Sequence, residues 1–566
     1  MKSLLKKPEP PLVAVIAVLL VILILGWREF WSMTDDAYIA FRYVSNSIKG
    51  FGFVWNPPPF RPVEGYTSFL WIVILDFFWR LFGVEPPQIA NSLLLGFSCL
   101  NLIAWAGIAD FIARTRGYAN SYKRALLVFS ALLGIVLNTT FLAWSSSGLE
   151  TALFNFLVSL WIGINIHAFK KSESYIFSVA LVSSLIYLTR PDGLAYVGIS
   201  FVLAVHAIAT EQRGSKWHYK SLLGFAPFLI FIMHILWRKS FYGVWLPNTY
   251  YAKYVSAWPE SGLKYLVSFI IEYGLWFWLG GLAIWCMSLW KRRTIRSVLP
   301  ASAWLPLFKP ASVIVALTFP FAYYTLVIGG DHFEYRVYSY LIPIVFVSFL
   351  LFVLELASSF RKAVGLMLLF VLISLPVQWV LWIQTQKFVE RESAHILIVP
   401  ISDFFPQPLK ALVEVFDSDQ EWLIPHFVGM RHQEHKVFFE YQTSQYPPRN
   451  DTGSFEALGY PVYTTGTVGV PGWVFPNFAI IDRKGLNDFV IARNPTPKNE
   501  FRRMAHDRDP PPGYVECFRP NVKREVDPAT GAIKSVILDR NIPLTRDEII
   551  NCENRHWSSG LSATIR

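Results

Sequence analysis

The sequence predicts a mainly α-helical bundle that crosses a membrane many times. Hydrophobic residues fill 53% of its 566 positions and aromatic residues 16%, and the mean hydropathy is +0.38, which is outside the range of ordinary soluble domains. A formal charge of +11 would suit a nucleic-acid-binding protein, but the basic residues form short clusters between long apolar runs. That pattern is typical of membrane topology, and we expect no nucleic-acid partner.

About eleven apolar runs approach the twenty or so residues that a spanning helix needs. The expected spans are residues 10–30, 88–113, 124–142, 149–169, 174–189, 193–210, 220–238, 265–290, 311–328, 337–358 and 363–384. Lys2, Lys6 and Lys7 precede the first run, which lacks a small-x-small cleavage site. We therefore expect a retained signal anchor rather than a cleaved signal peptide.

The basic clusters between these runs occupy alternate loops. They contain Arg114, Arg116, Lys123 and Arg124; Lys170 and Lys171; Arg213, Lys216 and Lys220; Lys291, Arg292, Arg293 and Arg296; and Arg361 and Lys362. The positive-inside rule places these loops and the N-terminus in the cytoplasm. This requires the apolar stretch from Tyr66 to Phe82 to lie along the outer interface, which Asp76 and Arg80 within it favour. The alternative is an ordinary span that breaks the charge rule.

The topology divides the chain into two predicted domains. Residues 1–386 form a transmembrane module, in which residues 31–87 are the first outer loop, and residues 387–566 form an extracytoplasmic soluble domain. Pro and Gly punctuate the second domain, and strand, turn and helix patterns such as 478–493 indicate a small α/β fold. Cys517 and Cys552 are free to pair if this domain lies in an oxidising compartment.

Two adjacent carboxylates, Asp35 and Asp36, follow the first span almost immediately. Carboxylates are costly within lipid but well placed at its edge, where a base or nucleophile can meet the head of a lipid-linked substrate. Capping is the alternative interpretation, because Thr34 or Asp35 suits the N-terminus of a helix that continues through Tyr43. On such a helix the two carboxylates diverge by about 100°, so we do not expect them to be equivalent.

Six ordered motifs in the outer loops carry a family resemblance. They are Asp35–Tyr43, Glu64–Thr67, Gly148–Thr151, Arg190–Gly193, Pro247–Lys253 and Gly329–Asp331, followed in the C-terminal domain by Asp482–Arg493, Ala505–His506 and Pro511–Pro512. In this order they resemble the terminal arabinofuranosyltransferase family, whose members are GT-C glycosyltransferases. The resemblance implies a GT-C fold with interfacial helices in the first outer loop. It also implies a polyprenyl-phosphate-linked sugar donor, a cell-envelope glycan acceptor and an essential acidic residue at the outer face of the cytoplasmic membrane.

Glycosyl transfer of this kind needs an activated hydroxyl, stabilisation of oxocarbenium-like charge, and cations that hold the departing phosphate. We predict Asp35 as the catalytic carboxylate and Asp36 as its support or as a ligand of sugar hydroxyls. The predicted donor-binding residues are Arg42, Glu64, Tyr66, Arg190, Lys253, Asp331, His332 and Arg336.

Several of these residues have a plainer explanation, and those alternatives stay open from sequence. Lys253 can snorkel to lipid headgroups, and His332 can be a solvated loop residue. The remaining alternatives are ion pairs, namely Arg190 with Asp192, Glu64 with Arg61, and Arg42 with one of the two aspartates.

No metal site is assigned. A divalent cation bridging the phosphate is left open, because Asp35, Asp36, Asp331 and His332 are suitable ligands without a diagnostic spacing. His432 and His435 lack zincin spacing and are interpreted as surface residues. A non-catalytic assembly or motility factor on the same scaffold, a transporter, and a GT-C enzyme for another sugar such as mannose are the competing functions.

Overall fold

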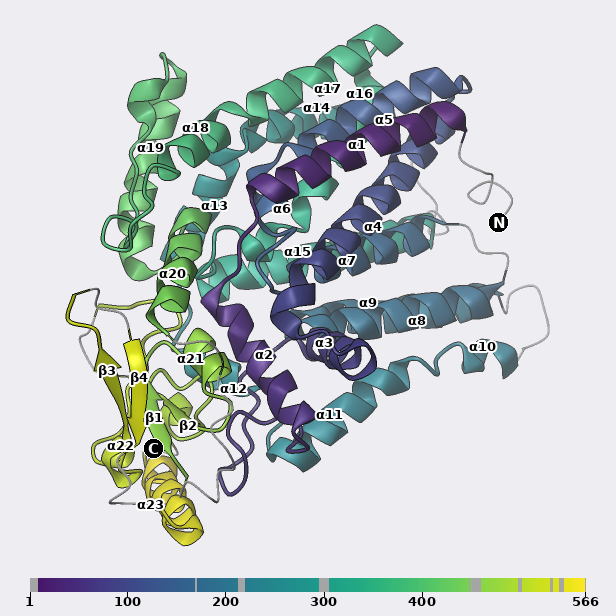
Figure 1. Cartoon of the computed structure of the whole chain (residues 1–566). Coiled ribbons are helices and arrows are strands. Elements are labelled where there is room, and N and C mark those ends of the chain that lie inside the picture. The colour runs from purple at the N-terminus through teal and green to yellow at the C-terminus, as the bar shows by residue number, and fades with distance from the viewer. Residues whose placement is uncertain are drawn as a thin grey trace.

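The structure, a computed structural model, describes residues 9–167, 171–211, 219–294, 305–446, 449, 460–496, 501–529, 533–538 and 544–564. Most of the N-terminal two thirds is helical, and long helices run side by side through the bundle (Figure 1). The helices of the bundle, long and short, are α1 (Pro10–Glu29), α4 (Pro86–Thr115), α5 (Ser121–Val136), α6 (Thr139–Ala143), α7 (Thr151–Ile166), α8 (Ser172–Thr189), α9 (Leu194–Glu211), α10 (Tyr219–Leu223), α11 (Phe228–Tyr242), α14 (Leu275–Thr294), α15 (Leu305–Tyr323), α16 (Leu341–Leu356), α17 (Phe360–Ser374) and α18 (Pro376–Thr385). The predicted helical membrane bundle is confirmed.

The predicted number of eleven spans is not confirmed. Within the described ranges, eight helices are long and apolar enough to cross a membrane, or nine if one bent pair counts as a span. That pair, α13 (Pro259–Glu272) and α14, bends by 89°, so the run predicted as one span at 265–290 is broken into two helices. Gly274 adopts a positive φ of 60° between the two helices, a conformation that suits glycine.

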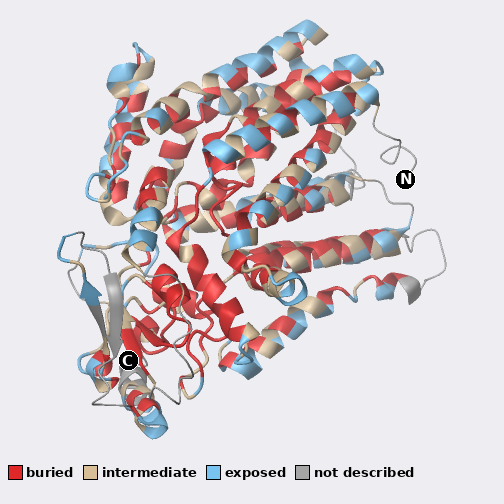
Figure 2. Cartoon of the chain, viewed as in Figure 1, coloured by how far each residue is buried: buried red, intermediate tan, exposed pale blue. Residues whose placement is uncertain are grey.

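The first outer loop contains two helices, α2 (Asp35–Ile48) and α3 (Phe69–Phe82). Twelve of the fourteen residues of α2 are buried, which shows in Figure 2 as a red helix at the centre of the molecule. Helix α3 is seen almost end-on in Figure 1, whereas α8 and α9 run lengthwise beside it. A helix transverse to the spans is the arrangement that an interfacial α3 requires, and its side of the membrane stays a prediction.

The C-terminal region is a small mixture of helices and strands. Its elements are α19 (Leu409–Leu423), α20 (His432–Gln445), β1 (Val462–Thr465), α21 (Gly469–Val474), β2 (Ala479–Asp482), α22 (Tyr514–Cys517), β3 (Val522–Val526), β4 (Ile533–Leu538) and α23 (Arg546–Thr564). Strands β1 and β2 pair in parallel, and β3 and β4 pair antiparallel. A disulfide joins Cys517 to Cys552, as predicted. The helix predicted after β2 is reduced to a short 3-10 turn at Ile491–Arg493.

This C-terminal region packs onto one end of the helical bundle (Figure 1). Helix α21 lies against α2, and α19 lies against α13. A buried ion pair ties the two parts together, with Arg431 3.0 Å from Glu272 and 3.3 Å from Glu334. Because α2 is enclosed by the bundle on one side and by α21 on the other, the two acidic residues at its start sit where the two parts meet (Figure 1).

Candidate active site

Two adjoining cavities open around the start of α2. The first, which we call the polar cavity, has a volume of about 250 Å³. The second, which we call the apolar cavity, has a volume of about 810 Å³. Six residues line both: Asp36, Ile39, Lys253, His332, Leu486 and Ala505. The predicted carboxylate Asp36 and the predicted cation Lys253 therefore lie at the junction of the two spaces.

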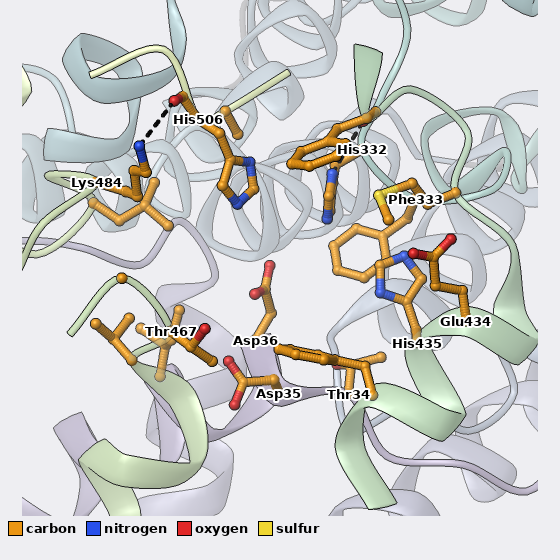
Figure 3. Close-up of a pocket in the computed structure, with 18 of the residues that line it drawn as sticks. Thr34, Asp35, Asp36, His332, Phe333, Glu434, His435, Thr467, Lys484 and His506 are labelled. Carbon is orange, nitrogen blue, oxygen red and sulfur yellow. Dashed lines mark hydrogen bonds between the residues drawn. The ribbon is translucent and has the colours of Figure 1, made fainter. Parts of the chain in front are cut away.

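The polar cavity is enclosed jointly by the bundle and the C-terminal region. Thr34, Asp35 and Asp36 form one wall, the loop at His332 and Phe333 another, and the chain around Thr467 a third. The segments carrying Lys484 and His506, which belong to the motifs of the C-terminal region, complete it. Figure 3 shows Asp36 pointing toward the side where His332 and His506 lie, whereas Asp35 points toward Thr467.

The apolar cavity lies between two membrane helices. Leu194 and Val202 of α9 face Val315 and Phe319 of α15 across it, and each of these four side chains is exposed. Since exposed apolar side chains on spanning helices meet lipid, this cavity is open toward the bilayer. Its inner end is charged and ends at Asp36.

The two aspartates have different surroundings. The Asp35 carboxylate accepts hydrogen bonds from the backbone N–H groups of Gly469 (3.1 Å) and Val470 (2.8 Å). Burial raises the pKa of Asp35 to about 7, the Val470 N–H opposes that rise, and the neighbouring Asp36 adds to it. The Asp36 carboxylate makes no hydrogen bond to any residue that the structure describes. The alternative of a side-chain cap on α2 is wrong, because neither the Thr34 nor the Asp35 side chain accepts from a backbone N–H of the first turn of that helix.

Three predicted cations line the inner end of the apolar cavity. Arg190 pairs with Asp192 at 3.1 Å, as the local alternative expected, and Arg336 pairs with Asp331 at 2.8 Å. Lys253, at the end of α12 (Asn248–Lys253), has no hydrogen bond or ion pair with any described residue. Burial lowers the pKa of Lys253, while the nearby Asp36 opposes the shift. The structure thus brings two paired guanidinium groups and one available ammonium to the same place.

Arg42 and Glu64 are not part of this site. The Arg42 guanidinium donates to backbone carbonyls, including those of Gly472 (2.7 Å) and Phe478 (2.6 Å), and lines neither cavity. It forms no ion pair with either aspartate. Glu64 is fully buried and pairs with Arg238 of α11 rather than with Arg61. Both residues therefore stabilise the fold through buried polar contacts.

Tyr66 and His332 do line the cavities. Tyr66, whose hydroxyl lies 3.1 Å from that of Tyr242, is on the wall of the apolar cavity. The His332 Nδ1 lies 3.0 Å from the Phe427 carbonyl oxygen, so the solvated-loop alternative is wrong. Burial and the neighbouring His506 lower the pKa of His332 to about 4. At neutral pH this imidazole is uncharged.

The sequence interpretation placed two further histidines, His432 and His435, on the surface, but both lie near this site. His432 contacts Ser32 Oγ at 3.0 Å and His435 lines the polar cavity, so the surface interpretation of this pair is wrong. Glu150 also lines the apolar cavity and was visible only as part of a motif. Among the described residues, no three His, Cys, Asp or Glu side chains converge as a metal site. The geometry therefore gives no ligand set from which to place a divalent cation.

Comparison with known proteins gives a sequence relative. No family model matches the chain. A stretch of 262 residues, 44% of the chain, is 24% identical to the terminal beta-(1->2)-arabinofuranosyltransferase of Mycobacterium tuberculosis (strain ATCC 25618 / H37Rv). The resemblance to glycosyltransferases is confirmed. The match spans only 39% of the length of that curated relative.

Among solved structures, ArnT from Cupriavidus metallidurans bound to undecaprenyl phosphate is similar over 84% of this chain and 87% of its own, with a TM-score of 0.47 and 12% sequence identity.

Proposed function

We propose that this protein is a membrane glycosyltransferase that moves a sugar from a polyprenyl phosphate to a glycan at the outer face of the cytoplasmic membrane. The observation that carries the proposal is the position of Asp36, an unpaired carboxylate among the described residues, where a cation-rimmed apolar cavity meets a polar one. The sequence relative is an arabinofuranosyltransferase, which makes arabinofuranose the first candidate sugar. Mannose or another hexose is the alternative.

The donor lipid occupies the apolar cavity in this proposal. A prenyl chain enters between α9 and α15, whose exposed apolar side chains match it, and its phosphate reaches the charged inner end. Lys253 is the cation there that pairs with no described carboxylate, whereas Arg190 and Arg336 already face Asp192 and Asp331. The two arginines still offer N–H donors to phosphate oxygens, since a guanidinium has five.

The acceptor glycan occupies the polar cavity, and Asp36 acts between the two substrates. In an inverting reaction, Asp36 takes the proton of the acceptor hydroxyl as its oxygen bonds to the anomeric carbon, and the C–O bond to phosphate breaks with its electrons passing to the phosphate. The cations stabilise that charge. In a retaining reaction the same carboxylate is the nucleophile and forms a glycosyl intermediate. Asp35, already engaged by two N–H groups, is less suited to either role.

Transfer by the purified full-length chain tests this proposal. The chain in lipid nanodiscs is supplied with polyprenyl phosphoarabinofuranose and an arabinan fragment, and the product is detected by mass spectrometry. We expect one added pentose with the wild-type chain and a rate about a hundredfold or more lower with Asp36→Asn, which keeps size but removes the base. Polyprenyl phosphomannose in a parallel reaction decides the sugar. No product from either donor, or an undiminished rate with Asp36→Asn, contradicts the proposal.

A further inference from the structure

Helix α21 is held against α2 at both of its ends. Asp35, in the first turn of α2, accepts the N–H groups of Gly469 and Val470 at the start of α21. Arg42, two turns further along α2, donates to the carbonyl oxygens of Gly472 and of Phe475 at the end of α21. An anion thus meets the positive end of this short helix and a cation meets its negative end.

The fit between the two helices is close enough to require glycine. A Cβ atom added at Gly469 would lie 1.9 Å from the Asp35 backbone oxygen, and one added at Gly472 would lie 2.8 Å from the Trp55 ring. Arg42 is 1% exposed and also donates to the Trp55 carbonyl at 2.8 Å. A side chain at Gly469 or Gly472 would therefore force α21 away from Asp35 or from Trp55.

The chain that leads into α21 is a wall of the polar cavity. Gly466, Thr467 and Val468 all line that cavity and directly precede Gly469. A shift of α21 along α2 would move this wall relative to Asp36. The contacts at Asp35 and Arg42 therefore set the shape of the space that faces the acceptor, although Arg42 itself lines neither cavity.

We propose that Asp35 and Arg42 are positioning residues that clamp α21 onto α2 and so make the C-terminal region a part of the acceptor cavity. This deepens the function proposed above and rests on it for its kinetic consequences. It reverses the sequence prediction for the acidic pair: Asp35 shapes the cavity through α21, and Asp36 acts on the substrate.

Four variants of the full-length chain test the clamp, with folding checked by size-exclusion chromatography. Asp35→Asn keeps one of the two oxygens that accept from α21, and Asp35→Ala removes both. Arg42→Gln weakens the other end, and Asp36→Asn is the matched control. Hydrogen exchange of residues 469–475 should rise in Asp35→Ala and Arg42→Gln, rise less in Asp35→Asn, and remain as in wild type in Asp36→Asn. Unchanged exchange in both weakened variants overturns the clamp.

Transfer kinetics separate positioning from chemistry. We expect Asp35→Ala and Arg42→Gln to raise the acceptor KM by about tenfold, the size of a lost cap, with the donor KM unchanged. Their double variant should show less than the product of the two effects, because both residues hold one helix. Asp35→Asn should keep kcat within about threefold of wild type. A hundredfold loss of kcat in Asp35→Asn, with exchange as in wild type, would make Asp35 the base and overturn the inference. If the wild-type chain transfers no sugar, the proposed function fails and the exchange pattern still decides the clamp.

Discussion

Replacing Lys253 by glutamine removes a cation that lines both cavities and has no bonded partner among the described residues. The two nearby arginines each pair with an aspartate within 3.1 Å, so Lys253 is the cation most available to a lipid phosphate. A hydrogen bond to a charged group contributes about 1.5–3 kcal/mol. The dissociation constant for a polyprenyl phosphate should therefore rise about ten- to 150-fold.

Titration of nanodisc-embedded protein with polyprenyl phosphate, followed by calorimetry, measures this change. Lys253→Arg should recover only part of the affinity, because a planar guanidinium does not reproduce a compact ammonium. Lys264→Gln is a matched control, since Lys264 pairs with Asp419 at 3.0 Å and lines neither cavity. Equal titration curves for wild type and Lys253→Gln would refute the reasoning and reduce Lys253 to an interfacial anchor.

The remaining predictions concern topology and stability. A cysteine at Gly83, introduced after the free cysteines are replaced by serine, should react with an impermeant thiol reagent from outside the cell, because we predict α3 at the outer interface. Labelling only from the cytoplasm would reverse the predicted topology. Cys517→Ser should destabilise the C-terminal region by about 3–4 kcal/mol, since the bond to Cys552 closes a separation of 35 residues, and an unchanged thermal midpoint would argue otherwise. Glu64→Gln should lower the free energy of unfolding by about 3 kcal/mol, because it leaves the buried Arg238 charge unpaired. Adding Arg238→Met should restore part of that stability. A double variant no more stable than Glu64→Gln would exclude this pairing effect.

The sequence predicts the helical bundle well because apolar length is a local property. All eleven predicted spans overlap a helix or consecutive helices in the structure. The run at 265–290 differs in shape, because Gly274 lies inside the apolar pattern and the chain turns there through 89°. A hydropathy average over the whole run does not register a single glycine. The break is visible only in the structure, where Gly274 has a positive φ.

The site residues divide according to how local their partners are. The Arg190–Asp192 and Arg336–Asp331 pairs join residues two and five positions apart, so the sequence brings them within reach. Arg42 instead bonds to carbonyls 430 and more positions away. Residue spacing in the sequence cannot predict such a distant contact. From sequence alone, a buried structural arginine cannot be distinguished from an arginine that binds phosphate.

The order of the acidic pair was also beyond the sequence. The divergence of adjacent helical residues correctly makes Asp35 and Asp36 unequal, but it does not say which one meets the cavity. That depends on α21, whose first N–H groups lie 434 and 435 positions after Asp35. The position of His435 was likewise not predictable from sequence. His435 lines the polar cavity because α20 packs beside α2, which is a contact between distant parts of the chain.

The most direct test of the central claim is a cryo-EM structure of the full-length chain in nanodiscs with a non-transferable polyprenyl phosphosugar analogue. We predict that the lipid lies between α9 and α15, that its phosphate contacts Lys253, and that the anomeric carbon faces the Asp36 carboxylate. A sugar placed against Asp35, or a phosphate bound away from Lys253 with the apolar cavity empty, would contradict the assignment.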